Sequence, residues 1–367
     1  MRKVLFTTNI PSPYKVDFFN ELGKYIDLTV VFERKSAKTR DDEWLQSKIV
    51  NFQAVFLKGI AVGDDTALCM GVIPLIKKEN FDCIIIGAYY TPTGILTSQY
   101  LRLFHKPFSF SGDGGFVRQE DKIKRKIKNQ LQSGGQVYFS PSKSGDEVLM
   151  NAGYKQNQII RYPFTSIREK DILAKPVSRE EKCTIREELG IRERQMVLGV
   201  GRLLDWKGWD TLFDATVSLG EEVGIYLVGG NPKGTCYERY AEKKSSNINF
   251  VEFKQKDALE MYYKAADVFV LPSHEEVWGL VVNEAMARGL PVITTRSCTA
   301  GRELVEDSVN GFLINPKNSR QLSEKLKIIL QNTDLQTVMS NNSIKKIKEY
   351  TIENMAIKYA SVIETLK

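Results

Sequence analysis

Short β-branched runs alternate with amphipathic segments along the chain, and this alternation limits the folds open to it more than any other feature. In the first half the runs are KVLFTT (3–8), DLTVVF (27–32), DCIIIG (82–87), PFSF (107–110), QVYFS (136–140) and QIIRY (158–162). In the second half they are MVLGVG (196–201), GIYLVG (224–229), INFVEF (248–253), DVFVLP (267–272), LPVITT (290–295) and GFLIN (311–315). Strands that alternate with helices predict parallel sheets covered by helices.

The two series of strands predict two α/β domains. The chain has 367 residues, which exceeds the size at which one hydrophobic core usually stops growing. A polar stretch with two prolines lies near residues 163–180 and suits a linker between domains. Ligands of open parallel sheets bind outside the carboxyl ends of the strands. Two Rossmann-like domains that face each other would therefore share one ligand-binding cleft.

The net positive charge of the chain lies in its first half. Residues 1–165 contain 23 Lys and Arg and 16 Asp and Glu, whereas residues 166–367 contain 29 of each group. Part of the excess is QEDKIKRKIKNQLQ (119–132), where apolar residues recur every four positions and predict a basic amphipathic helix. This helix is either an ordinary solvated helix or a contact for anionic lipid headgroups. Nucleic acid is not expected as a partner, because the chain has no nucleic-acid-binding motif.

Composition excludes several other classes of protein. No apolar run approaches the roughly 18 residues of a membrane span, and the N-terminal apolar stretch is too short for a signal peptide. We therefore expect a cytoplasmic protein, held peripherally at the inner face of the plasma membrane if the basic helix binds lipid. The five cysteines are widely spaced and include no CxxC pair, which predicts reduced thiols. The chain has two histidines, and its paired aspartates do not follow apolar strands as metal-binding aspartates would. We therefore expect neither a metal site nor a cofactor.

The segment GVGRLLDWKGWDTL (199–212) follows a predicted strand and opens a predicted helix. Gly201 permits a tight turn, Arg202 and Lys207 are cations, and the start of a helix has free amides. Together these features predict an anion site suited to a diphosphate. The segment is not a dinucleotide motif, since Leu204 stands where the third glycine belongs. The competing interpretation is that both cations are ordinary surface charges.

Two carboxylates lie eight positions apart in PSHEEVWGLVVNEAMARG (272–289), which otherwise has the composition of a buried segment. Glu276 falls on a loop after a strand, with Gly279 as the hinge, and Glu284 falls on the second turn of the following helix. An ionised carboxylate accepts two hydrogen bonds from the vicinal hydroxyls of a sugar or ribose. The pair therefore predicts two polyol sites on either side of a diphosphate. A charge at the start of a helix is the alternative role for either glutamate, and it suits Glu276 better than Glu284.

These motifs resemble those of the retaining GT4 glycosyltransferases, which have the GT-B fold. GRLLDWKG is similar to the diphosphate element of that family, and GLPVITT and ELVEDSVNGFLI follow in the expected order. The resemblance is specific over about residues 186–330 and loose over residues 1–165. The family pattern P-S-x-x-E-G-F-G-L-x-x-x-E-A-M-A-x-G coincides with this chain at Pro272, Ser273, Glu276, Gly279, Leu280, Glu284, Ala285, Met286, Ala287 and Gly289.

The resemblance implies a role for each domain and for single residues. Residues 1–165 would bind the acceptor, residues 166–349 would bind the donor, and a final helix near 350–367 would cross back onto the first domain. Arg202 and Lys207 would bind the donor diphosphate. Glu276 would contact the transferred sugar and Glu284 the ribose. Backbone groups near these side chains would complete the donor site, at Gly201, Gly279, Leu280 and Thr299.

The chain departs from the family pattern in its first domain and beside the first glutamate. Val277 stands in place of a glycine, and NIPSPYK (9–15) replaces a glycine-rich loop with prolines that remove amides. Many family members place a histidine after the fourth strand, where this chain has SGDGG with Asp113 as the ionisable residue. Asp113 either takes a catalytic role in place of that histidine, orienting the acceptor, or forms a turn. His274, beside the acidic loop, is a further candidate for contact with the ligand.

The sequence thus predicts a retaining, metal-independent glycosyltransferase. Its donor would be a UDP- or GDP-linked sugar. Its acceptor would be a glycan or a lipid-linked glycan of a bacterial surface polysaccharide such as capsule, O-antigen or lipopolysaccharide. Arg202, Lys207 and helix amides would stabilise the charge on the departing nucleotide diphosphate, while Glu276 would flank the developing oxocarbenium ion. Two alternatives stay open, a GT-B nucleotide-sugar epimerase and a non-catalytic partner subunit of another transferase.

Overall fold

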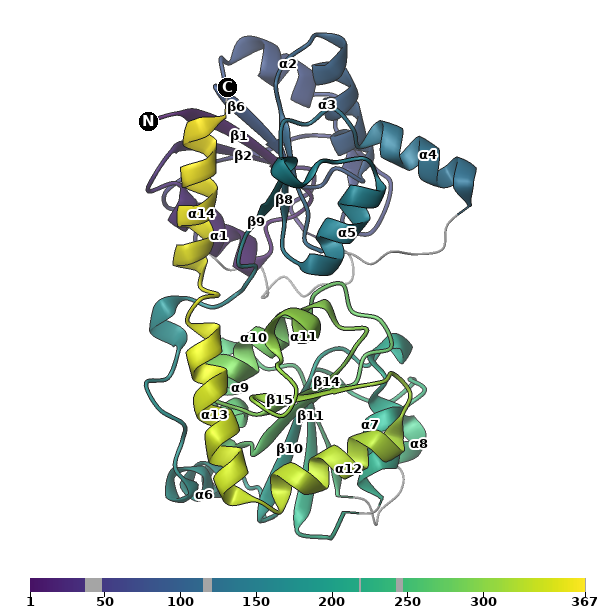
Figure 1. The fold of residues 1–367 in the computed structure, drawn as a ribbon, viewed down its shortest axis with the longest axis vertical. Helices are drawn as coiled ribbons and strands as arrows, with labels where there is room; N and C mark the ends of the chain where they lie inside the picture. Colours follow the sequence, from purple (N-terminus) through teal and green to yellow (C-terminus); the bar gives the residue numbers. More distant parts are fainter. Residues whose placement is uncertain (37–47, 115–120, 218, 242–246, 367) are drawn as a thin grey trace. The chain divides into compact units, whose positions relative to one another are not determined.

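A computed structural model describes residues 1–36, 48–114, 121–217, 219–241 and 247–366 (Figure 1). The chain forms two compact units. The first consists of residues 1–166 and 351–367, and the second of residues 167–350. Among the described residues, no helix is long and apolar enough to cross a membrane.

The first unit is an α/β unit built around a parallel sheet. The strands of this sheet are β1 (Lys3–Thr8), β2 (Asp27–Phe32), β3 (Gln53–Phe56), β6 (Cys83–Ile86), β7 (Ser109–Ser111), β8 (Tyr138–Ser140) and β9 (Ile159–Arg161). The helices are α1 (Pro13–Leu22), α2 (Val72–Lys78), α3 (Pro92–Leu103), α4 (Lys122–Leu131), α5 (Lys143–Asn151) and α14 (Ile352–Thr365). A small antiparallel hairpin joins β4 (Ile60–Ala61) and β5 (Ala67–Leu68), and a 3-10 turn, η2 (Gln156–Gln158), precedes β9.

The order of the strands in this sheet is β3-β2-β1-β6-β7-β8-β9. The chain runs outward from β1 to β3 and then returns to place β6 beside β1, so the connection changes direction between β1 and β6. The carboxyl ends of strands at such a switch point are where open parallel sheets bind ligands. The loops after β1 and β6 are therefore the expected functional edge of this unit.

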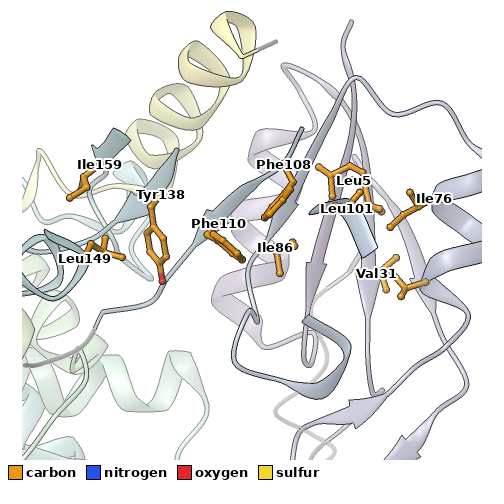
Figure 2. Close-up of a cluster of buried hydrophobic side chains, with 12 residues drawn as sticks. Leu5, Val31, Ile76, Ile86, Leu101, Phe108, Phe110, Tyr138, Leu149 and Ile159 are labelled. Carbon is orange, nitrogen blue, oxygen red and sulfur yellow. The ribbon is translucent and has the colours of Figure 1, made fainter. Parts of the chain in front are cut away.

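One face of this sheet carries a continuous apolar core (Figure 2). Leu5, Ile86 and Phe110 project from three adjacent strands, and Ile76 of α2 and Leu101 of α3 pack against them. These side chains are at most 2% exposed. Because the sheet is parallel and covered by helices, its strands are apolar on both faces rather than alternating with polar residues.

The opposite face is covered by α1 and by α14, the last helix of the chain (Figure 1). The ring of Tyr359 stacks on Phe139 of β8 with centroids 4.0 Å apart, and its hydroxyl hydrogen-bonds Ser111 Oγ at 2.7 Å. Phe18 of α1 meets the same tyrosine edge-on at 5.0 Å. The C-terminal helix is thus part of the core of the first unit.

The second unit is also an α/β unit with a parallel sheet. Its strands are β10 (Gln195–Val200), β11 (Val223–Val228), β12 (Ile248–Val251), β13 (Val268–Leu271), β14 (Val292–Thr295) and β15 (Gly311–Ile314). Its helices are α6 (Arg179–Glu188), α7 (Trp209–Thr216), α8 (Glu238–Ala241), α9 (Lys256–Ala265), α10 (Leu280–Ala287), α11 (Thr299–Leu304), α12 (Ser319–Leu330) and α13 (Thr333–Ile347). Two 3-10 turns, η3 (Glu169–Asp171) and η4 (Asp205–Lys207), complete it.

The strand order of the second sheet is β12-β11-β10-β13-β14-β15. The chain proceeds from β10 to β12 on one side and then returns to set β13 against the other side of β10. The switch point therefore lies between β10 and β13. The loops that leave these two strands carry the predicted diphosphate motif and the first predicted carboxylate.

The predicted α/β architecture with two parallel sheets is confirmed, and each predicted strand lies within two residues of an observed one. The strand β3 and the hairpin β4–β5 were not predicted. The final helix expected near residues 350–367 is present as α14, separate from α13, and the side chain of Thr351 caps it by accepting a hydrogen bond from the Asn354 amide. The basic helix is present as α4; residues 119 and 120 of the predicted span lie outside the described residues.

Candidate functional site

The loops after β10 and β13 approach each other closely, and Gly208 permits this. Its φ is 68°, a left-handed conformation that suits glycine, and a Cβ there would stand 2.4 Å from the carbonyl oxygen of Pro272. The His274 amide donates to the Trp206 carbonyl at 2.8 Å across the same junction. The diphosphate motif and the loop that carries Glu276 are therefore joined through their backbones.

Lys207 and Glu276 form an ion pair at this junction. Lys207 Nζ donates to Glu276 Oε2, and Ser273 Oγ donates to the same carboxylate oxygen at 3.3 Å. Both side chains are mostly buried, with 16% and 17% exposure. An ammonium and a carboxylate 69 positions apart in sequence are thus held together at the switch point of the sheet. Such a pair offers a cation for a phosphate and an acceptor for hydroxyl groups.

Arg202 is an exposed residue whose backbone is held in place by a hydrogen bond. Its carbonyl oxygen accepts a hydrogen bond from Trp209 Nε1 at 3.0 Å, and the Trp209 side chain is fully buried. The indole therefore fixes the turn that follows β10 and leads into η4. The two predicted cations therefore have different surroundings. Lys207 is held in an ion pair, whereas Arg202 is exposed on a turn that Trp209 holds in place.

The backbone of Glu276 is tied to the loop after β14. Its amide donates to the Ser297 carbonyl at 3.0 Å, and its carbonyl accepts from the Thr299 amide at 3.1 Å. The Cys298 amide donates to Thr295 and the Ala300 amide to Trp278. Because these amides bond to protein carbonyls, Thr299 and its neighbours position Glu276.

The thiol of Cys298 lies beside this loop and remains protonated. Burial, together with the nearby Glu276 carboxylate, raises the pKa of Cys298 to about 12. The thiol donates a hydrogen bond to the Trp278 carbonyl at 3.2 Å. Cys298 is therefore a structural residue, because nucleophilic chemistry requires the thiolate.

Glu284 has a partner that the sequence did not reveal. Tyr263, on α9, donates its hydroxyl to Glu284 Oε2 at 2.9 Å. The tyrosine is 2% exposed, and burial, together with the Glu284 charge, raises its pKa well above the ordinary value. It therefore remains a neutral donor. Gly279 begins α10 in a left-handed conformation with φ 97°, and Leu280 is the first residue of the helix that carries Glu284.

His274 lies against Gly208, and its Nε2 atom is buried without a hydrogen-bond partner among the described residues. His105, in contrast, is an exposed residue in a left-handed turn before β7, with φ 52°. The structure thus brings His274 into the same loop junction as Lys207 and leaves His105 in a turn of the other unit.

Asp113 lies in the first unit, just after β7, and is part of a polar cluster at the carboxyl edge of that sheet. Tyr14 donates its hydroxyl to Asp113 Oδ2 at 3.2 Å, and Lys15 Nζ lies 3.9 Å from the same oxygen. Lys15 also donates to Asn9 Oδ1 at 2.7 Å. Two residues of the NIPSPYK segment, Tyr14 and Lys15, therefore contact Asp113 with side-chain groups, and Asn9 contacts Lys15. The sequence had indicated the loss of amides in this loop but not the gain of these side chains.

A buried carboxylic acid, Glu33, lies after β2 at the same edge. It accepts hydrogen bonds from the Ala67 amide at 3.0 Å and from the Thr91 hydroxyl. Burial is the main cause that raises the pKa of Glu33 to about 7, since removal from water disfavours the charged form, and the nearby Asp65 carboxylate acts in the same direction. Glu33 joins β2, the hairpin that includes β5 and the start of α3.

The second unit matches a known protein family. Residues 181–346 match the model described as "Glycosyl transferases group 1". The N,N'-diacetylbacillosaminyl-diphospho-undecaprenol alpha-1,3-N-acetylgalactosaminyltransferase of Campylobacter jejuni is 23% identical over 298 residues, which are 79% of this chain and 78% of that protein. The lipopolysaccharide glucosyltransferase WaaG of Escherichia coli is 29% identical over 192 residues, which are 51% of this chain and 50% of WaaG.

Solved structures share the fold over the whole chain. The Anabaena Alr3699/HepE structure, in complex with UDP and glucose, matches with a TM-score of 0.75 at 18% identity and covers 100% of both chains. The fold is therefore GT-B, a glycosyltransferase fold with two Rossmann-like domains, as predicted. The second unit thus matches the group 1 glycosyltransferases, the GT4 family, and the chain as a whole matches the GT-B fold.

Proposed function

We propose that this protein is a retaining transferase that moves a sugar from a UDP- or GDP-linked donor to a glycan or lipid-linked acceptor. The observation that carries the proposal is the Lys207–Glu276 ion pair at the switch point between β10 and β13. In this proposal Lys207 and Arg202 bind the donor diphosphate, Glu276 contacts the transferred sugar, and Glu284, oriented by Tyr263, accepts hydrogen bonds from the ribose.

The ion pair gives a physical route for donor binding. An ammonium has three donors, so Lys207 can keep its contact with Glu276 while it binds a phosphate oxygen. The negative charge on the diphosphate grows as the sugar–phosphate bond breaks, and fixed cations stabilise that charge most in a water-poor site. Cations held this way supply the charge stabilisation without a metal ion. Gly201, Gly279 and Leu280 shape the backbone around the donor, and Thr299 acts through Glu276.

The acceptor belongs to the first unit in this proposal. Asp113 and Lys15 offer a carboxylate and an ammonium at the carboxyl edge of its sheet, and such groups bind sugar hydroxyls and phosphates. The likeness to the Campylobacter jejuni and Escherichia coli enzymes supports an acceptor of bacterial surface polysaccharide synthesis, such as capsule, O-antigen or lipopolysaccharide. We place the reaction at the cytoplasmic face of the membrane, where the acceptor lipid would be reached.

Calorimetry with UDP, GDP and their sugar conjugates tests the donor site. Lys207→Ala should weaken binding of the free nucleoside diphosphate and of the nucleotide sugar alike. Glu276→Gln should weaken binding of the nucleotide sugar but not of the free diphosphate, because Glu276 is assigned to the sugar and its neutralisation leaves the Lys207 charge available to the phosphates. Equal losses for both ligands in both variants would contradict the division of roles.

Product analysis separates the proposal from its alternatives. A transferase needs an acceptor, so incubation with the donor alone should yield no isomerised nucleotide sugar. Conversion of the donor by itself would instead identify an epimerase. Absence of nucleotide-sugar binding in a folded protein would identify a non-catalytic subunit. Turnover that disappears with EDTA and returns with Mg²⁺ would contradict the metal-independent mechanism.

A further inference from the structure

The helix α4 (Lys122–Leu131) is attached to the first unit at one end. Arg102 NH1 donates to the Gln130 carbonyl at 2.7 Å, and Gln99 Nε2 donates to the Leu131 carbonyl at 3.1 Å. No side chain of α4, whose ten residues are all described, is buried. In Figure 1 the other end of the helix extends away from the sheet of its own unit. The helix thus exposes most of its circumference over its first two turns.

The charges of α4 oppose the formation of the helix. Its sequence, KIKRKIKNQL, contains five cations and no acid, and the first turn holds Lys122, Lys124 and Arg125. Cations near a helix N-terminus interact unfavourably with the helix dipole, and like charges four positions apart, such as Lys122 and Lys126, repel. The side chain of Asp121 caps the helix but supplies a single negative charge. A segment that breaks local rules in this way is typical of a functional site.

The apolar residues of α4 are as unusual as its charges. Ile123 and Ile127 are 70% and 57% exposed, and they lie one turn apart on the same side of the helix. Beside them, Lys122, Arg125 and Lys126 line an open depression of about 440 Å³ together with polar groups of Asn129, Gln130, Ser133, Asn151 and Ala152. The helix therefore presents an apolar ridge next to a cationic concavity.

An anionic lipid bilayer fits both features at once. Its headgroup phosphates match the cations, and its acyl region accepts the isoleucines, as for helices that lie in the plane of a membrane interface. An acidic protein or a nucleic acid would match the cations alone. The excess of seven positive charges in residues 1–165, from 23 Lys and Arg against 16 Asp and Glu, has the same sign as α4. The first unit as a whole is therefore attracted to an anionic surface.

We propose that α4 binds in the interface of an anionic lipid bilayer, with Ile123 and Ile127 inserted below the headgroups and Lys122, Arg125 and Lys126 on lipid phosphates. This contact would hold the enzyme at the surface where a lipid-linked acceptor resides. The contact does not depend on the donor chemistry, so it can be tested without turnover.

The test is sedimentation with vesicles of phosphatidylcholine alone and of phosphatidylcholine mixed with phosphatidylglycerol. The wild-type protein should bind the mixed vesicles, bind the neutral vesicles weakly, and be released by salt. Lys122→Glu/Lys126→Glu should lower the partition coefficient at least tenfold, since each basic residue near an anionic surface contributes about fivefold. This variant should keep the helix, because acidic residues suit a helix N-terminus. Ile123→Gln/Ile127→Gln should also lower binding severalfold.

The matched control is Lys78→Glu/Lys106→Glu, which makes the same charge change at two other exposed positions of the first unit. It should retain binding within about twofold to threefold, because the charges lie outside α4. Equal loss in the control would overturn the assignment to α4. Binding that depends on the lysines but not on the isoleucines would overturn insertion, because it would show that the helix adsorbs to the headgroups by charge alone. Thermal unfolding of each variant checks that the first unit stays folded.

Discussion

The hydroxyl of Tyr263 donates a hydrogen bond to Glu284 Oε2 at 2.9 Å, from a side chain that is 2% exposed. Tyr263 lies on α9 and Glu284 on α10, so the contact joins the helices that precede and follow β13. A neutral, buried donor fixes the orientation of the carboxylate without removing its charge. In the proposed site, this oriented carboxylate accepts hydrogen bonds from a ribose.

Tyr263→Phe should weaken donor binding and leave the chemical step nearly unchanged. A hydrogen bond to a charged group contributes about 1.5 to 3 kcal/mol, which corresponds to an increase in the donor KM of about tenfold to a hundredfold. Phenylalanine keeps the ring and its packing against Phe269, whose centroid lies 5.9 Å away. Steady-state kinetics with varied donor concentration measure the split between KM and kcat. An unchanged KM would show that Tyr263 does not position a ligand-binding group.

Lys207→Ala should reduce kcat/KM at least tenfold. The loss of a charge-assisted contact in the transition state corresponds to about 1.5 to 3 kcal/mol. Lys264→Ala is the matched control, because Lys264 also pairs with a glutamate of the second unit, Glu260, at 2.6 Å. This control pair is a partly exposed i,i+4 pair on a helix, and its loss should change kcat/KM less than about twofold. Similar losses in both variants would assign the effect to general destabilisation.

Glu276→Gln should lower kcat at least tenfold while the protein remains folded. Glutamine can still accept the hydrogen bond from Ser273 but cannot offset the Lys207 charge or flank a developing oxocarbenium ion. In a double-mutant cycle with Lys207→Ala, the two losses should be less than additive, because each substitution disrupts the same pair. Additive losses measured by kcat/KM would indicate that the two residues act independently.

Gly208→Ala should destabilise the second unit and weaken donor binding. A left-handed backbone costs a non-glycine residue about 1 to 3 kcal/mol, and the added Cβ would also meet the Pro272 carbonyl at 2.4 Å. Gly190→Ala is the matched control, because Gly190 has a φ of 70° and no atom within 4 Å of the added Cβ. The difference in unfolding temperature between the two variants isolates the close approach of the loops. Equal destabilisation would mean that this approach is unimportant.

The sequence predicted those parts of the fold and site that depend on periodicity and on the direction of parallel strands. Lys207 and Glu276 follow neighbouring strands, so their proximity follows once β10 and β13 are known to be adjacent. The strand β3 was missed because QAVF is short, lies at the edge of its sheet and contains a single β-branched residue. Edge strands carry a weaker hydrophobic signal than central ones.

The rest of the site depends on contacts that periodicity does not encode. Tyr263 lies on an amphipathic helix, where an aromatic residue has the signature of a core position, and its hydroxyl meets Glu284 only through the packing of α9 and α10. The amides of Cys298, Thr299 and Ala300 donate hydrogen bonds to the carbonyl groups of Thr295, Glu276 and Trp278. These partners can be identified only from the tertiary structure. Lys15 and Asp113 are likewise 98 positions apart in sequence and meet at a sheet edge.

The stability of the first unit should decrease as pH rises from about 4.5 to about 7, because of Glu33. The pKa of Glu33 is about 7 in the folded protein, whereas 4.5 is the ordinary value for a solvated glutamate. Between pH 4.5 and pH 7 the folded state therefore binds more protons than the unfolded state. The free energy of unfolding then falls with increasing pH, by at most about 3 kcal/mol across the window. The extra stability is fully present below pH 4.5 and is lost once pH passes through 7.

Glu33→Gln separates this effect from other titrating groups. Glutamine can accept the hydrogen bond from the Ala67 amide but carries no titratable proton, so the contribution of Glu33 disappears from the pH profile. The quantity to measure is the difference in unfolding free energy between wild type and variant. Denaturant titrations give this difference between pH 5 and pH 8, a range that ends about one unit above the pKa of Glu33 in the folded protein. Wild type should lose stability relative to Glu33→Gln as pH rises. A difference that stays constant would show that Glu33 is already ionised in the folded protein, and that hydrogen bonds from Ala67 and Thr91 outweigh the cost of burial.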